Sequence, residues 1–154
     1  VVTEIAGNYH GADYSVGIVC AEFNEFITDR LLEGALRTFK RADLKDENIT
    51  VYRVPGSFEI PAMARAVLEN KNHDGLLAIG AVIRGETDHF DYVCSGVTSG
   101  LSRLNCQYPV PISFGVLTTD SVDQAIDRAG AKAGNKGSEA AFSLIETMTA
   151  LDSI

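Results

Sequence analysis

The chain has 154 residues, of which 45% are hydrophobic, and a formal net charge of −8 at pH 7. This size predicts one compact domain over residues 1–154, and the acidic balance argues against a nucleic-acid partner, because phosphate backbones attract Lys and Arg clusters. No apolar run approaches the ~20 residues of a membrane span and no signal-peptide pattern opens the chain, so we expect a cytoplasmic protein without a membrane partner.

Strand and helix patterns alternate along the sequence. Residues 1–14 carry little pattern and are expected to form a peripheral strand or arm. Short apolar runs predict four strands, over residues 15–21, 49–54, 76–83 and 112–117. Apolar residues at helical spacing predict helices over residues 27–42, 60–68, 89–104, 122–129 and 141–151.

Two details refine this pattern. Ser121 and Gln124 fit a capping box for the short helix at 122–129, and the glycine-rich segment 130–137 is expected to break the chain before the last helix. The run 76–83 is apolar throughout, as in a strand buried on both faces. The alternation of strands and helices, together with this buried strand, implies an α/β fold, a flavodoxin-like three-layer αβα sandwich around a four-stranded parallel sheet.

Three connections leave the carboxyl ends of predicted strands and can meet at one crevice of such a sheet. They are Glu22–Asn24, Gly56–Glu59 and Ala81–His89. The last is the most informative, because the chain turns there from a buried strand into a helix, whose free N–H groups can bind an anion. An aromatic ring, a carboxylate, a glycine turn and a histidine are therefore expected at one edge.

Each candidate residue has an alternative explanation. Phe23 could offer a flat surface to a heterocycle or could simply plug the sheet edge. Glu59 could accept hydrogen bonds from sugar hydroxyls, although a favourable charge at a helix start explains it more economically. His89 suits proton transfer near neutral pH, or it is a solvated residue at the start of a helix.

The segment Gly85–Thr87 could present N–H groups and a hydroxyl to a phosphate, with the Glu86 side chain facing away. Arg128 and Lys136 could be charged helix ends in solvent. Phe114 lies mid-strand, far from the carboxyl edge, so Phe114, Arg128 and Lys136 would serve one site more naturally if a neighbouring subunit supplied them.

The cysteines Cys20, Cys94 and Cys106 are odd in number and scattered, with no CxxC pair. They are expected to be free thiols in a reducing compartment, not disulfide partners or metal ligands.

Several spaced motifs resemble one family. They are FNEFIT (23–28), VPGSFEIP (54–61), GAVIRGETDHFDYV (80–93), FGVLTTD (114–120) and RAGAKAGNKG (128–137). In this order they resemble the signature segments of the lumazine synthases, from about residue 15 to the C-terminus. The resemblance implies condensation of 5-amino-6-(ribitylamino)uracil with 3,4-dihydroxy-2-butanone 4-phosphate to 6,7-dimethyl-8-ribityllumazine, the penultimate step of riboflavin synthesis, without cofactor or metal.

The resemblance also implies residue roles. Those that would bind the pyrimidine and its ribityl chain are Phe23, Asn24, Ser57, Phe58, Glu59, Ala81, Val82, Ile83, Phe114 and Lys136. Those that would bind phosphate are Gly85, Glu86, Thr87 and Arg128, and His89 would transfer protons. Phe114, Arg128 and Lys136 would come from the adjacent subunit of a homopentamer. In this family an insertion before the last helix goes with free pentamers, and segment 130–137 resembles the short form, so the resemblance implies twelve pentamers in a 60-subunit shell.

Three other functions compete with this one. A flavin- or nucleotide-binding module would use the same sheet edge without turnover, and a riboflavin synthase of archaeal type would act on the lumazine itself. A pure container would have lost the chemistry, yet Phe23, Glu59, His89, Arg128 and Lys136 are all present.

Overall fold

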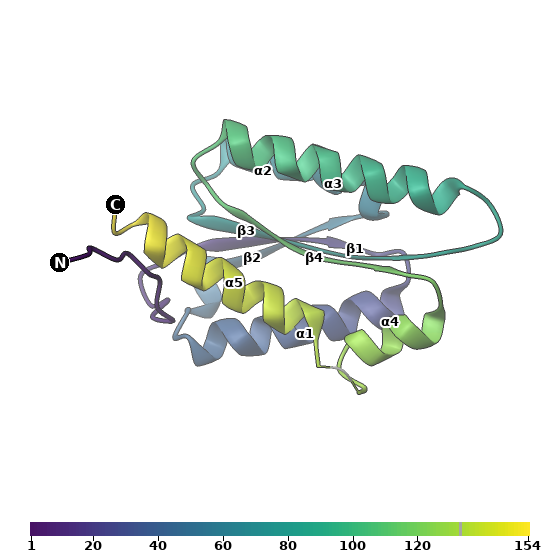
Figure 1. Cartoon of the computed structure of the whole chain (residues 1–154), viewed down its shortest axis with the longest axis horizontal. Coiled ribbons are helices and arrows are strands. Elements are labelled where there is room, and N and C mark those ends of the chain that lie inside the picture. Colours follow the sequence, from purple (N-terminus) through teal and green to yellow (C-terminus); the bar gives the residue numbers. More distant parts are fainter. Residues whose placement is uncertain (133) are drawn as a thin grey trace.

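The central element is a parallel sheet with strand order β2–β1–β3–β4 (Figure 1). The structure is a computed structural model that describes residues 1–132 and 134–154. The strands are β1 Val16–Ala21, β2 Ile49–Val54, β3 Gly75–Ile83 and β4 Ile112–Thr119. All four predicted strands are confirmed, and β4 runs to Thr119, beyond the predicted end at residue 117.

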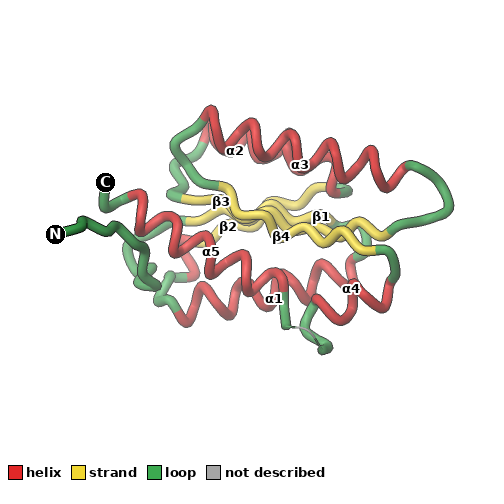
Figure 2. Tube along the Cα trace, viewed as in Figure 1, coloured by secondary structure: helices red, strands yellow, loops and turns green. Residues whose placement is uncertain are grey.

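Helices cover both faces of the sheet (Figures 1 and 2). On one face lie α2 (Ile60–Asn70) and α3 (His89–Gln107), and on the other α1 (Glu25–Arg41), α4 (Val122–Arg128) and α5 (Lys136–Leu151). Short 3-10 turns, η1 Asp46–Asn48 and η2 Ser57–Glu59, precede β2 and α2. This arrangement confirms the flavodoxin-like three-layer sandwich. Within the described residues, no helix combines the length and the apolar character needed to cross a membrane.

The protein has one hydrophobic core on each face of the sheet, and strand β3 contributes side chains to both. Leu77 and Ile79 pack with the cluster formed by α1 and α5, whereas Leu76 and Ala78 pack with the cluster formed by α2 and α3. Every residue of β3 except Ile83 is buried. The continuous apolar run in the sequence follows from this double burial. It gives the residues beyond Ile83 a firmly held starting point.

Helices α1 and α5 pack closely at a glycine. A Cβ added at Gly137 would lie 2.0 Å from the backbone oxygen of Leu31, so only glycine fits. Helix α5 begins at Lys136, inside the segment 130–137 that we expected to break the chain. The reason is Asn135, whose side chain accepts a hydrogen bond from the N–H of Ser138 and so caps the helix. Residue 133 of that segment lies outside the described residues.

The predicted capping box of α4 is only half formed. The hydroxyl of Ser121 accepts a hydrogen bond from the N–H of Gln124 at 3.2 Å. The Gln124 side chain, however, accepts from the N–H of Asp120 at 2.8 Å instead of from Ser121. Gln124 therefore fixes the backbone of the residue that directly follows β4.

The N-terminal segment 1–14 forms an arm and contains no strand. It packs along α5 near the C-terminus, as the neighbouring chain ends in Figure 1 show. The N–H of Asn8 donates to the hydroxyl of Thr149 at 2.8 Å, and Tyr14 donates to Asp152 at 2.9 Å.

Candidate active site

Strands β1 and β3 are neighbours in the sheet, but the chain leaves them toward opposite faces. After β1 it enters α1 on one face, and after β3 it enters α3 on the other. A crevice is expected at this point of an open α/β sheet. A cavity of about 640 Å³ is found there, lined from the connections after β1, β2 and β3.

The structure brings most of the candidate site residues together in this cavity. Those that line it are Phe23, Asn24, Ser57, Phe58, Glu59, Ala81, Val82, Ile83, Gly85, Thr87 and His89. It is also lined by Gly56, the first residue of the second predicted connection, and by four residues that we did not single out as site residues, Pro55, Phe90, Tyr92 and Val93. Tyr92 and Val93 follow His89 by three and four positions, and this helical spacing was the signal that could have identified them.

Hydrogen bonds fix the three connections against one another. Asn24 adopts the left-handed conformation (φ 63°) at the start of α1, which asparagine tolerates better than most residues. Its side-chain amide donates to the carbonyl of Ala81 at 2.9 Å and so links the ends of β1 and β3. The N–H of Phe23 donates to the carbonyl of Pro55 at 2.9 Å and links the ends of β1 and β2.

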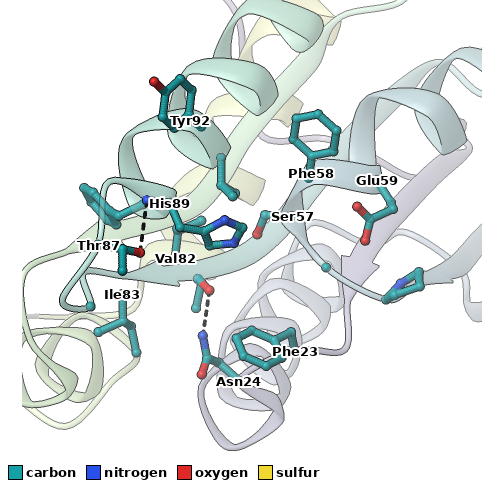
Figure 3. Close-up of a pocket in the computed structure, with 16 residues that line it drawn as sticks. Phe23, Asn24, Ser57, Phe58, Glu59, Val82, Ile83, Thr87, His89 and Tyr92 are labelled. Atoms are coloured by element: carbon teal, nitrogen blue, oxygen red, sulfur yellow. Dashed lines mark hydrogen bonds between the residues drawn. The ribbon is translucent and has the colours of Figure 1, made fainter.

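Three aromatic side chains at the cavity are largely exposed. The relative exposure of Phe23 is 71%, that of Phe58 is 60% and that of Tyr92 is 74%. In Figure 3 Phe23 lies on the α1 side of the cavity, and Phe58 and Tyr92 lie on the opposite side. Large rings left uncovered around a cavity offer flat apolar surfaces on which a heterocycle can stack.

His89 is the first residue of α3, and its imidazole extends into the cavity toward Ser57 (Figure 3). Its N–H donates a long hydrogen bond of 3.4 Å to the hydroxyl of Thr87. Within residues 1–132 and 134–154 no protein group forms a hydrogen bond with the imidazole itself. The ring is exposed, so both nitrogens can exchange protons with a ligand.

The loop before His89 is suited to bind an anion. Within the described part of the chain, the N–H groups of Gly85, Glu86 and Thr87 have no hydrogen-bond acceptor. Gly85 and Thr87 line the cavity, whereas the exposed Glu86 does not, so its carboxylate does not lie among the lining groups. Free N–H groups next to a helix start attract negatively charged oxygens.

A family model for 6,7-dimethyl-8-ribityllumazine synthase matches residues 13–152 of this chain. The chain belongs to this family. The resemblance noted from the sequence motifs is thereby confirmed, and the protein is a member of a family of transferases that act in riboflavin synthesis.

Four residues implied by the lumazine synthase resemblance lie outside the cavity of their own chain. Phe114 and Lys136 line a different cavity of about 400 Å³ between β4 and α5, and the two cavities share no lining residue. Arg128 is exposed at the end of α4, and Glu86 is exposed beside the cavity. Among the described residues, the main cavity is therefore lined by no Lys or Arg.

Proposed function

We propose that this member of the lumazine synthase family condenses 5-amino-6-(ribitylamino)uracil with 3,4-dihydroxy-2-butanone 4-phosphate and releases phosphate. The observation that carries the proposal is the exposed Phe23 ring across the cavity from His89, in a chain whose residues 13–152 match the family. A surface that can bind a heterocycle and a group that can transfer protons therefore face the same cavity.

The pyrimidine substrate fits the side of the cavity formed by β1 and β3. Its ring would stack on Phe23, and its polar edge would meet main-chain groups of Ala81, Val82 and Ile83. Glu59 lines the cavity and is only partly exposed, so its carboxylate can accept hydrogen bonds from ribityl hydroxyls. Ser57, Phe58 and Asn24 would complete this side.

The phosphate of the second substrate fits the N–H groups of Gly85 and Thr87. The amine would attack the ketone and lose water to form a Schiff base. Elimination of phosphate and ring closure with loss of a second water then give the lumazine. Each step moves a proton, and His89 is the imidazole within reach. Holding the two substrates in register would supply much of the remaining acceleration.

A neighbouring subunit would complete the site. A phosphate dianion calls for cationic partners, and the described lining contains none. We therefore assign Phe114, Arg128 and Lys136 to the cavity of the adjacent chain in a homopentamer. Twelve pentamers would form a 60-subunit shell. Multi-angle light scattering tests this assembly, and a particle of only five chains would refute the shell while leaving the reaction intact.

The reaction is tested by mixing the purified protein with both substrates and following lumazine absorbance and free phosphate. Stoichiometric appearance of both products is the expected result. Absence of both products, together with tight flavin binding, would instead favour a binding module on the same fold.

The role of His89 is tested by His89→Ala. We expect turnover to fall about 100-fold, at the low end for positioned acid–base groups, because water reaches this exposed imidazole and can replace part of its function. Binding of the ribitylaminouracil, measured by calorimetry, should change little. Near-wild-type turnover would exclude His89 from proton transfer.

A further inference from the structure

Arg84 is the first residue after β3 and contacts three separate elements. Its Nε donates to the carboxylate of Asp120, after β4, at 2.9 Å. A terminal nitrogen lies 3.6 Å from the carboxylate of Asp91, in the first turn of α3. The guanidinium also lies over the ring of Phe90, 4.4 Å from its centroid. One side chain thus joins the ends of two strands to the start of the helix that carries His89.

Asp120, the partner of Arg84 at the end of β4, is itself held in place. Asp120 directly follows β4, and its N–H donates to the side chain of Gln124 on α4 at 2.8 Å. The N–H of Arg84 donates to the carbonyl of Thr119 at 2.9 Å, which continues the pairing of β3 with β4. The backbone of Arg84 is therefore fixed by the sheet, and its partner Asp120 is fixed by α4, while its side chain extends to α3.

The polar groups at the start of α3 are weakly held, although the buried ring of Phe90 packs into the core beneath α2 and α3. Asp88 precedes the helix without a side-chain capping bond, and the N–H of His89 makes only the 3.4 Å bond to Thr87. The imidazole has no hydrogen-bond partner within the described residues. The position of His89 therefore depends on the backbone of the first helical turn. The core holds this turn through Phe90, and Arg84 contacts it through Phe90 and Asp91.

Neither stability nor direct substrate contact explains this arrangement. The side chains of Arg84, Asp91 and Asp120 are 45%, 60% and 71% exposed, and ion pairs this accessible to water contribute little to stability. Arg84 does not line the cavity, and its charge is directed to two carboxylates. What these contacts do define is geometry, because a planar guanidinium holds its partners in fixed directions.

We propose that Arg84 is a positioning residue, which places His89 for proton transfer by joining the first turn of α3 to Asp120 at the end of β4. This inference rests on the proposed function of the cavity. It assigns no substrate contact to Arg84.

The test compares Arg84→Gln, Arg84→Lys and the control Arg103→Gln, an exposed arginine farther along α3. We expect Arg84→Gln to lower kcat about 10-fold with KM for both substrates unchanged, because small displacements of a reacting group are costly. Arg84→Lys should recover part of the loss, and the control should match the wild type. In a His89→Ala background, Arg84→Gln should have no further effect.

Three outcomes would overturn the proposal. A raised KM for the butanone phosphate with unchanged kcat would mean that Arg84 binds phosphate directly. An equal loss of kcat in the His89→Ala background would mean that Arg84 does not act through His89. Unchanged kinetics would mean that Arg84 does not influence the site.

A second readout separates this proposal from the proposed function. Wild-type protein that forms no lumazine would refute the function. The rate at which diethyl pyrocarbonate modifies His89, relative to the exposed His10, reports the position of the imidazole without substrates. We expect Arg84→Gln to change this ratio about threefold, in line with a displaced side chain. An unchanged ratio would overturn the positioning role whatever the reaction.

Discussion

Replacing Phe23 with Ala removes the aromatic surface at the exit of β1 and leaves the packing of the protein nearly intact. The ring is 71% exposed, so the free energy of unfolding should change by less than about 0.5 kcal/mol. Stacking of a heterocycle on an aromatic side chain contributes about 1 to 2 kcal/mol. Affinity for the ribitylaminouracil should therefore fall about 5- to 30-fold.

Phe26 provides the matched control. It lies three residues away in α1, is 54% exposed and does not line the cavity. Isothermal titration calorimetry of Phe23→Ala and Phe26→Ala with the ribitylaminouracil should show weaker binding only for the first. Equal affinities for the two variants would refute the stacking role of Phe23, whatever their absolute values.

Two further predictions concern stability. Burial lowers the pKa of His73, which lies between the hydroxyls of Ser15 and Tyr52, below its usual value of 6.5. The unfolded chain then binds a proton more readily, so stability present above pH 6.5 is lost as the pH falls toward the folded pKa. The urea midpoint should therefore be lower at pH 5.5 than at pH 7.5. The variant His73→Gln should show a smaller difference between these two midpoints. An identical pH dependence in that variant would exclude His73 as the cause. Gly137→Ala should lower the melting temperature, because overpacking at this contact should reduce the free energy of unfolding by about 1–3 kcal/mol. The control Gly85→Ala should leave the melting temperature unchanged, because its Cβ would meet open space. Equal melting temperatures for the two variants would contradict the close packing of α1 and α5.

The fold was predictable because the apolar pattern directly reports burial. The run at 76–83 lacks alternation because β3 has a core on each face, and the helical spacing from Phe90 to Leu104 follows the buried face of α3. The start of α5 was not predictable from glycine content. It depends on Asn135, a single polar residue whose side chain caps the helix, while Gly137 lies inside the helix at its close contact with α1.

The candidate site was predictable where it lies on strand ends, because parallel strands bring their carboxyl ends to one edge. Tyr92 and Val93 were also predictable in principle, because they follow His89 by three and four positions and so share its face of α3. The contact of Arg84 with Asp120 links residues far apart in the sequence, and no local sequence pattern predicts it. The separate location of Phe114 agrees with its mid-strand position, and its role in an adjacent site stays a prediction.

The end of β3 marks a sharp boundary in backbone protection. Amide hydrogens up to Ile83 belong to a strand shared by two cores and exchange with solvent only when much of the domain opens. Two residues later, the amides of Gly85, Glu86 and Thr87 have no acceptor in the described structure and exchange almost as in an unfolded chain. The cavity thus places its most exchangeable amides directly beside its most protected ones. An anion bound there would slow the exchange of those three amides while leaving the strand unchanged.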